Sequence, residues 1–389
     1  MGTLEAAFIG TYPPTQCGLA TFTAALRNAM APGLDITRSP VVRVVDQPDG
    51  RRPREVAFEW CRGDQAGPDQ VRAVLASADI GVIQHEYGIF DGRDGAAIVD
   101  VMRDAPVPLI VVLHTVLAEP SRSQQRILEA VCESAAAVVT QSHAARQRLF
   151  QRFAVEAGKI HVIPHGAAPN LTVDDGDPAP SRRREQVVLT WGLIGPGKGL
   201  EHAIDAIAEL SDLDPAPRYV IAGQTHPKVR AAQGETYREG LRARALSLRV
   251  AERVHFDDRY RSVEELNALI RTADIVLLPY ESRDQVTSGV LVEALASGKP
   301  VVATAFPHAR EALASGAGRL VPHDNPVAMA EAIRALVVDP ALAAAARASA
   351  AQAGRSLFWP EVGRRYLDLA VLTASEYEPR DRRALQASG

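Results

Sequence analysis

Short apolar runs alternate with amphipathic segments along most of this 389-residue chain. The runs are four to seven residues long and rich in valine, isoleucine and leucine, as is typical of parallel strands buried on both faces. The segments between them carry helical periodicity. This alternation predicts an α/β protein with Rossmann-like, doubly wound sheets. The predicted strands are 4–10, 80–84, 109–113, 137–141, 160–163, 186–191, 218–223, 254–257, 275–279 and 301–304.

The pattern is interrupted once by a polar stretch with the composition of a linker. Residues 171–185 combine proline, glycine and clustered charge, which predicts a domain boundary. We therefore expect an N-terminal domain over 1–170 and a second domain over 186–355. The amphipathic segment 356–389 is expected to cross back to the first domain. Residues 46–68, rich in arginine, aspartate and proline, show no clear pattern.

The last two predicted strands enclose the most informative helix. The segment 288–297 is apolar almost all the way round and ends in a glycine followed by a proline two positions later, which is a helix stop signal. Its sole charge is Glu293. A buried carboxylate is costly unless it is paired or hydrogen-bonded, so Glu293 requires a partner, either a core arginine or a ligand.

The loop before this helix is suited to an anion. Gln285, Thr287, Ser288 and Gly289 lead into the helix N-terminus, where unpaired N–H groups and the helix dipole face the carboxyl edge of the strands. Ligands of open α/β sheets bind at that edge. An anion at the loop, with Glu293 accepting from ligand hydroxyl groups, describes a site for a sugar nucleotide.

Two glycine-containing loops follow strands in the same way. One contains Gly18 and precedes a predicted helix over 20–30, and the other contains Gly197 and Lys198. Glycines let the backbone approach a phosphate closely, and the lysine supplies positive charge. The second loop is not a Walker A motif, because no serine or threonine follows the lysine.

Histidines follow four of the predicted strands in the first domain. They are His85, which precedes Glu86, and His114, His143 and His165. Imidazole can hydrogen-bond a sugar hydroxyl or relay its proton near neutral pH. A metal site is the alternative, but only Glu86 supplies a nearby carboxylate, so no metal is predicted.

Charge and cysteine content narrow the range of partners and compartments. The net charge of −4 and the pI of about 6.2 give no reason to expect a nucleic-acid partner. Cys17, Cys61 and Cys132 lack metal-ligand spacing and suggest free thiols in a reducing compartment. No leader segment and no apolar run of about 18 residues is present, so we expect a cytoplasmic protein with at most peripheral membrane contact.

The segment 273–304 resembles the C-terminal signature of the GT4 family of retaining glycosyltransferases, which have the GT-B fold. The family motif is Glu, seven residues, Glu; its second position matches Glu293, and Gln285 replaces the first. Lys198 matches the lysine of a family segment in which Arg and Lys neutralise the donor diphosphate. Leu193 stands where that arginine is expected.

The first half of the chain resembles the same family. Gly18 is similar to a family glycine that contacts the donor diphosphate, and His114 to a histidine beside the donor sugar and the acceptor hydroxyl. The motif that holds His85 and Glu86 resembles an acceptor-side motif. His165 replaces the usual asparagine of a segment that closes the N-terminal domain.

The resemblance implies two Rossmann-like domains facing each other across a cleft, and a retaining transfer of a hexosyl unit from a nucleotide diphosphate sugar. The acceptor would be a hydroxyl of a glycan, a lipid-linked sugar or a small molecule, with no cofactor. His114, Gln285 and Lys198 would be the catalytic residues, and Arg259 or Arg261 could replace the missing arginine. The alternatives are a GT-B phosphorylase, a UDP-N-acetylglucosamine 2-epimerase, and a weakly active sugar-nucleotide-binding protein.

Overall fold

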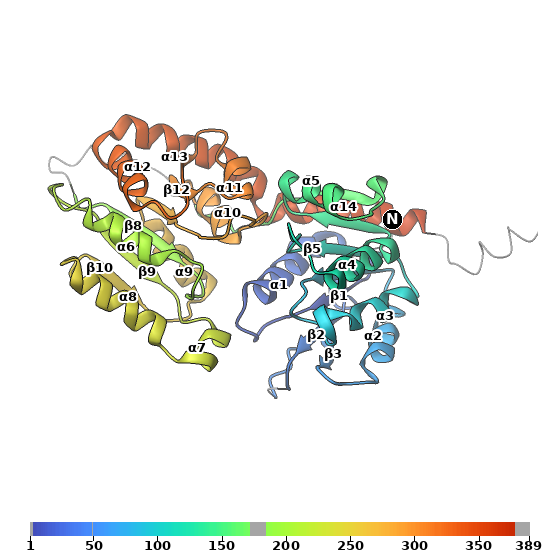
Figure 1. Ribbon diagram of the computed structural model, residues 1–389. Helices are drawn as coiled ribbons and strands as arrows, with labels where there is room; N and C mark the ends of the chain where they lie inside the picture. The colour runs from blue at the N-terminus through green and yellow to red at the C-terminus, as the bar shows by residue number, and fades with distance from the viewer. Residues whose placement is uncertain (1–2, 49, 172–183, 378–389) are drawn as a thin grey trace, which may run out of the picture. The chain divides into compact units, whose positions relative to one another are not determined.

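The chain forms two compact units, which are described separately. The computed structural model describes residues 3–48, 50–171 and 184–377 (Figure 1). Unit 1 contains the chain up to Gly166 and again from Trp359 onward, and unit 2 runs from Ala167 to Phe358. Apart from its end positions, the predicted linker over 171–185 lies outside the described residues.

Unit 1 is built on a seven-stranded, wholly parallel sheet with the strand order β3-β2-β1-β4-β5-β6-β7. Its strands are β1 Ala6–Gly10, β2 Val41–Val45, β3 Val56–Cys61, β4 Ile80–His85, β5 Leu109–Leu113, β6 Ala137–Thr140 and β7 Ile160–Val162. Its helices are α1 Gly18–Met30, α2 Gly67–Leu75, α3 Ala97–Arg103, α4 Arg122–Ser134, α5 His143–Arg152 and α14 Trp359–Glu376.

Strands β2 and β3 have no counterpart among the predicted strands. The apolar run of β2 is interrupted by Arg43, whose side chain is only 2% exposed. Its guanidinium donates to Glu59 of β3 at 2.8 Å and to the Thr15 hydroxyl at 3.0 Å, so the charge is neutralised across the sheet. Strand β3 therefore lies within residues 46–68, which showed no pattern, and a buried ion pair joins it to β2.

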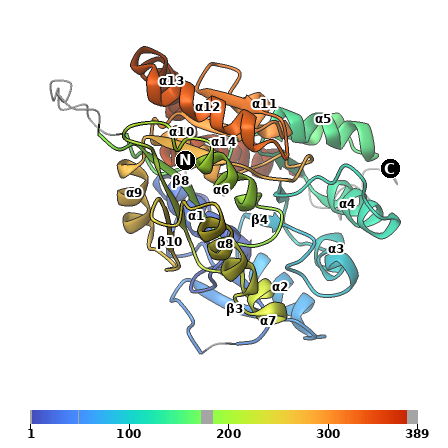
Figure 2. The ribbon, with the colours of Figure 1, turned by 60° about the vertical axis from the view of Figure 1, so that its left-hand side comes forward.

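Helix α14 packs against α1 on one face of the unit 1 sheet (Figure 2). Tyr366 and Leu369 of α14 join Phe22 and Leu26 of α1 in the same buried cluster. At Gly363 the helices are so close that a Cβ would lie 2.4 Å from a backbone carbonyl of α1. The C-terminal helix is thus part of the core of unit 1.

Unit 2 is a second doubly wound parallel sheet, with the strand order β10-β9-β8-β11-β12-β13. Its strands are β8 Val187–Trp191, β9 Arg218–Ala222, β10 Val254–Asp257, β11 Ile275–Leu278, β12 Val301–Thr304 and β13 Gly318–Val321. Its helices are α6 Leu200–Ala208, α7 Pro227–Gln233, α8 Thr236–Ser247, α9 Val263–Thr272, α10 Gly289–Ala296, α11 Pro307–Ala312, α12 Pro326–Val338 and α13 Pro340–Gly354.

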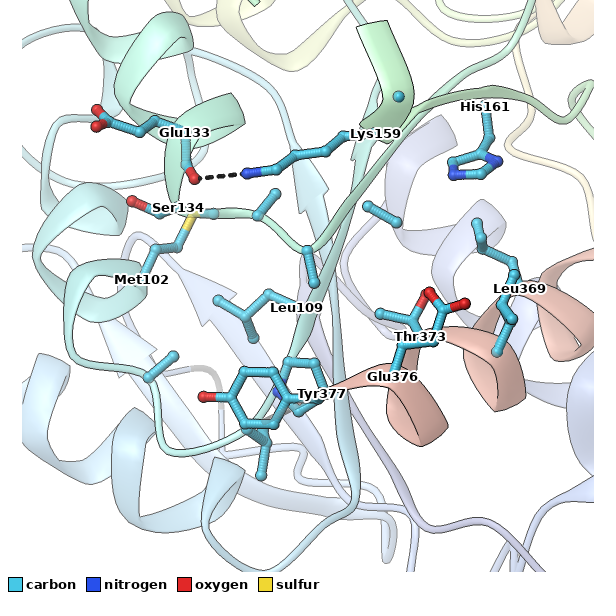
Figure 3. A pocket seen from close by; sticks show the side chains of 18 of the residues that line it. Met102, Leu109, Glu133, Ser134, Lys159, His161, Leu369, Thr373, Glu376 and Tyr377 are labelled. Carbon is cyan, nitrogen blue, oxygen red and sulfur yellow. Dashed lines mark hydrogen bonds between the residues drawn. The ribbon is translucent and has the colours of Figure 1, made fainter. Parts of the chain in front are cut away.

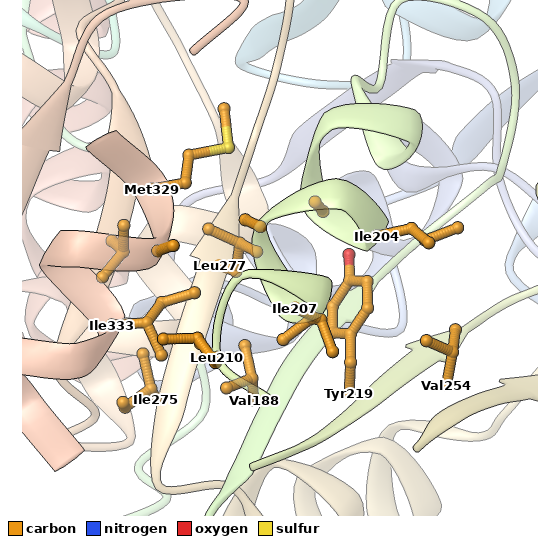
Figure 4. Close-up of a cluster of buried hydrophobic side chains, with 14 of the residues drawn as sticks. Val188, Ile204, Ile207, Leu210, Tyr219, Val254, Ile275, Leu277, Met329 and Ile333 are labelled. Carbon is orange, nitrogen blue, oxygen red and sulfur yellow. The ribbon is translucent and has the colours of Figure 1, made fainter. Parts of the chain in front are cut away.

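A buried cluster joins one face of this sheet to α6 and α12. Ile207 of α6 and Ile333 of α12 pack with Val188, Tyr219 and Leu277 from three strands (Figure 4). This core holds β8 and β11 side by side at the centre of the sheet. Two doubly wound parallel sheets confirm the predicted α/β class. Within the described residues, no helix is both long and apolar enough to cross a bilayer.

Candidate functional site

The loops that follow β8 and β11 meet at the centre of the unit 2 sheet. The strand order reverses between these two strands, and ligands of doubly wound sheets bind at that point. The Glu281 N–H donates to the Gly197 carbonyl at 3.1 Å. Gly199, with φ +63°, packs so closely on the Pro279 carbonyl that a Cβ would lie 1.9 Å from the oxygen. The glycine loop after β8 is therefore fastened to the segment after β11.

The sole charge of α10 is held by an uncharged partner. The Trp191 Nε1–H, at the end of β8, donates to Glu293 Oε2 at 2.7 Å. The alternative of a core arginine is wrong, because the partner that the structure shows is this indole. Burial raises the pKa of Glu293, and the hydrogen bond from Trp191 opposes that rise. The carboxylate is therefore oriented, but among the described residues it has no countercharge beside it.

The N-terminus of α10 presents two backbone N–H groups for a ligand. The Ser288 N–H donates to His308 Nδ1 at 2.9 Å, and the Ser288 hydroxyl accepts from the Leu291 N–H at 3.3 Å. The N–H groups of Gly289 and Val290 have no hydrogen-bond acceptor in the described part of the chain. Burial lowers the pKa of His308 to about 4, so its ring is neutral and Nδ1 can accept.

Gln285, which stands where the family motif has its first glutamate, forms a hydrogen bond within its own loop. Its Nε2 donates to the Thr287 carbonyl at 2.9 Å. The Thr287 hydroxyl is buried and finds no partner among the described residues. Glu281 and Asp284, the acidic residues nearest in sequence to Gln285, are both exposed. A catalytic role of Gln285 stays a prediction, since its amide supports the loop.

Lys198 is half-buried beside an aromatic ring. Its Nζ lies 4.5 Å from the centre of the Tyr280 ring, and burial lowers its pKa. Gly197, just before it, has φ +86° and nothing within 4 Å of the position of a Cβ. This backbone conformation favours glycine and leaves one side of the loop open.

The two arginines considered as replacements for the missing cation are already paired. Arg259 Nε lies 3.2 Å from Asp257 Oδ1, and Arg261 donates to the other oxygen of the same carboxylate. The hydrogen bonds lower the pKa of Asp257 to about 2, and the bond from Arg259 contributes most to this shift. Both guanidinium groups donate to one carboxylate, which cannot neutralise two positive charges, so the role of Arg259 or Arg261 near a diphosphate stays a prediction.

In unit 1, the histidine after β5 is held between two glutamines. His114 Nε2 lies 2.8 Å from Gln84 Oε1, and Gln141 Nε2 lies 3.3 Å from His114 Nδ1. With these orientations, Nε2 donates and Nδ1 accepts, which is the neutral ring. Burial holds the pKa of His114 well below its usual range, and His165 and His85 lower it further. Proton relay by His114 would require one of these contacts to break.

Three of the four strand-end histidines are buried or half-buried, and the fourth is exposed. The rings of His114 and His165 each contact Phe22 at a centroid distance of 4.8 Å. His85 is buried, and burial lowers its pKa to about 4. All four histidines lie at strand ends as predicted, but His143, in the first turn of α5, is exposed.

The remaining predicted residues of unit 1 lie at the same edge of the sheet. The Thr115 hydroxyl donates to Glu86 Oε2, and the Tyr87 N–H donates to Glu86 Oε1 at 3.1 Å. Gly18 begins α1, and nothing lies within 4 Å of the position of a Cβ there. Contacts of Gly18 and Glu86 with a donor or an acceptor stay predictions.

The site has no metal cluster among the described residues: no group of three or more histidine, cysteine, aspartate or glutamate side chains is placed to hold an ion.

A cavity of about 460 Å³ lies elsewhere in unit 1, at the amino ends of β5 and β6 (Figure 3). Leu109, Lys159, His161 and Thr373 are among its lining residues. The cavity lies at the edge of the sheet opposite to the edge that holds the strand-end histidines.

The tautomer of His114 supports a first prediction. Replacing Gln84 with glutamate places a carboxylate 2.8 Å from His114 Nε2 and favours the charged ring. We expect the pKa of His114 to rise by about one unit or more in Gln84→Glu. NMR titration of the imidazole resonances measures it. An unchanged His114 titration would mean that this glutamine does not control the ring.

Several residues of the site escaped the sequence analysis. Trp191, Tyr280 and His308 contact predicted residues, as do Gln84 and Gln141. The feature that could have identified them is their place in the chain, because four of the five end a strand or lie within two residues of a strand end. An aromatic or amide residue at such a place looks like ordinary core in the sequence alone.

Two family models match the chain. One, described as "Glycosyl transferases group 1", matches residues 177–355, and the other, "Glycosyltransferase Family 4", matches residues 31–171. Together they span parts of both units.

Curated relatives are similar over much of the chain. D-inositol 3-phosphate glycosyltransferase of Corynebacterium glutamicum is 31% identical over 277 residues, which cover 66% of this chain and 63% of that protein. The chain thus spans less than two thirds of that relative. D-inositol 3-phosphate glycosyltransferase 1 of Catenulispora acidiphila is 31% identical over 371 residues, covering 89% and 84%. Alpha-D-kanosaminyltransferase of Streptomyces kanamyceticus is 25% identical over 287 residues, covering 68% and 70%.

Solved structures share the fold. HepE of Anabaena in complex with UDP-glucose matches with a TM-score of 0.74 at 19% identity, covering 96% of this chain and 100% of that one. Sucrose-phosphate synthase of Thermosynechococcus elongatus matches with a TM-score of 0.72 at 17% identity, covering 99% and 100%. These matches confirm the Rossmann-like sheets of the GT-B fold.

Proposed function

Because this chain belongs to glycosyltransferase family 4, within the glycosyl transferases group 1, we propose that it transfers a hexosyl unit from a nucleotide diphosphate sugar to an acceptor hydroxyl. The observation that carries the proposal is the grouping at the β8–β11 reversal. There an ammonium, two unpaired N–H groups and an oriented carboxylate follow adjacent strands of one sheet.

Each of these groups suits one part of the donor. Lys198 and the N–H groups of Gly289 and Val290 supply positive charge and hydrogen bonds for a diphosphate. The buried Thr287 hydroxyl, which has no partner among the described residues, can add a further bond. Glu293 can accept from the ribose hydroxyls while Trp191 holds its other oxygen.

The transfer is proposed to proceed with retention and without a metal ion. The bond from the anomeric carbon to the phosphate oxygen breaks, and the bond to the acceptor oxygen forms on the same face. The leaving phosphate oxygen takes the proton of the acceptor hydroxyl, because Gln285 cannot act as a carboxylate nucleophile. Lys198 and the N–H groups of α10 balance the charge that develops on the leaving diphosphate.

The relatives suggest which substrates to test first. Neighbours of the fold bind UDP and UDP-glucose, so UDP sugars are the first donors. Relatives named D-inositol 3-phosphate glycosyltransferases make a phosphorylated inositol the first acceptor.

The test is incubation with UDP, GDP and ADP sugars, with and without this acceptor and with and without EDTA. We expect transfer to survive EDTA and the product to keep the anomeric configuration of the donor in its NMR spectrum. Inversion or loss with EDTA would contradict the mechanism. Donor turnover without an acceptor to an epimer, or phosphate-dependent cleavage of a disaccharide, would instead indicate an epimerase or a phosphorylase.

The hydrogen bond from Trp191 has a consequence for pH. Trp191→Phe removes a donor to the Glu293 carboxylate, so the pKa of Glu293, already raised by burial, rises further. If the ionised form binds the ribose, the acid limb of nucleoside diphosphate binding shifts to higher pH, by about one unit. Calorimetric titrations across pH measure the shift. The same profile in the wild type and the variant would show that Trp191 does not act through this carboxylate.

A further inference from the structure

The tyrosine that follows β11 lies beside the ammonium group of Lys198. The distance of 4.5 Å from Nζ to the ring centre is one at which the π face attracts a cation. Burial lowers the pKa of Lys198, and no charged neighbour in the described part of the chain offsets that cost. The π face of the Tyr280 ring therefore favours the charged form of this ammonium group.

Tyr280 is itself a rigid platform. Its side chain is 2% exposed and stacks on Phe306 at a centroid distance of 5.6 Å and an interplanar angle of 27°. The Thr304 hydroxyl donates to the Tyr280 carbonyl at 2.7 Å. Backbone and ring are both fixed by β12 and the residues just after it.

The backbone of the lysine loop is fixed to the same segment. The contacts of Gly197 with Glu281 and of Gly199 with Pro279 place the loop directly on the residues that flank Tyr280. The freedom that remains is the rotamer of the long Lys198 side chain. A flexible ammonium loses entropy when a ligand orders it, so a group that orders it beforehand improves binding.

We propose that Tyr280 is a positioning residue for the donor diphosphate, acting through Lys198. The Tyr280 ring orients the ammonium group of Lys198. This orientation compensates in part for the arginine that Leu193 replaces. The inference rests on the proposed function, in which Lys198 binds the diphosphate. The phenol ring carries the effect, and the Tyr280 hydroxyl, which lies near Ser288, is not required for it.

The experiment is calorimetric binding of UDP, GDP and ADP and of the matching nucleosides to the full chain. The variants are Lys198→Met, Tyr280→Leu, Tyr280→Phe and the Lys198→Met/Tyr280→Leu double variant. We expect Tyr280→Leu to weaken diphosphate binding about tenfold and nucleoside binding less than about twofold. Tyr280→Phe keeps the ring and should restore most of the diphosphate affinity. The double variant should bind no more weakly than Lys198→Met, because the tyrosine acts through the lysine.

The outcomes separate the two levels of the proposal. If Lys198→Met leaves diphosphate affinity unchanged, the assignment of Lys198 in the proposed function is wrong. If Lys198→Met weakens it but Tyr280→Leu does not, only the role of Tyr280 is overturned. Equal losses for diphosphate and nucleoside, or additive losses in the double variant, would show that Tyr280 merely supports the fold. A loss in Tyr280→Phe as large as in Tyr280→Leu would move the effect from the ring to the hydroxyl.

Discussion

Lys198→Met is expected to lower kcat/KM for the sugar donor by about 100-fold, the scale at which losing one stabilising charge at a leaving group acts. Methionine keeps the length and apolar stem of the side chain but removes its charge. Arg259 and Arg261 are not expected to compensate fully, because both guanidinium groups donate to Asp257. Steady-state kinetics with the accepted donor measure the loss, and we expect most of it in kcat, because the charge grows as the diphosphate leaves.

A matched control is available for this substitution. Lys159 lines the cavity at the amino ends of β5 and β6 in unit 1, and its ammonium group donates to the Glu133 carbonyl. Lys159→Met removes the same charge from the chain and should change kcat/KM less than about twofold, like most surface substitutions. Equal losses in both variants would mean that the total charge, rather than the position of Lys198, determines the rate.

Glu293→Gln is expected to weaken binding of the nucleotide sugar by about 50-fold, because hydrogen bonds to a charged group are among the strongest. The amide keeps the volume of the carboxyl group, and its oxygen can still accept from Trp191. Its NH2 group then faces the ribose hydroxyls and can only donate to them, so the hydrogen bonds that the carboxylate oxygen would accept are lost. Isothermal titration with the donor and with its 2′-deoxy analogue checks the cause, because the deoxy analogue should lose less.

The same substitution should make the protein more stable. Burial raises the pKa of Glu293, so the folded state disfavours its ionised form. Stability from such a group is lost as pH rises from its unfolded pKa through its folded pKa. The variant should therefore unfold at a higher temperature than the wild type at pH 8, and the difference should shrink toward pH 4. Glu331→Gln, on the exposed face of α12, serves as the control for charge alone. A less stable Glu293→Gln would mean that the carboxylate supports the fold.

Much of unit 2 could be predicted from the sequence because its signals are local. Strand β12 begins and ends where the pattern placed it, and β11 begins there, since an apolar run needs no distant partner to be recognised. The requirement that Glu293 has a partner was also local, because an acid inside an apolar helix is costly wherever the helix packs.

The choice of partners could not be predicted, because it depends on contacts between distant positions. Trp191 lies 102 positions before Glu293, and only the pairing of β8 with β11 brings them together. Strand β2 was missed for the same reason, since the charge of Arg43 looks incompatible with a buried strand until Glu59 is placed beside it. His114 was predicted at the right strand end, but the two amides that fix its tautomer come from neighbouring strands.

The discontinuous make-up of unit 1 affects the order in which the chain can fold during synthesis. Unit 2 is a continuous segment that can close as soon as it leaves the ribosome, whereas α1 waits for α14, which is made after unit 2. Until then, the apolar surface of Phe22 and Leu26 lacks its cover. Nascent chains stalled before Trp359 should therefore be a target for chaperones that bind exposed apolar surface, even though the whole first sheet has already been translated.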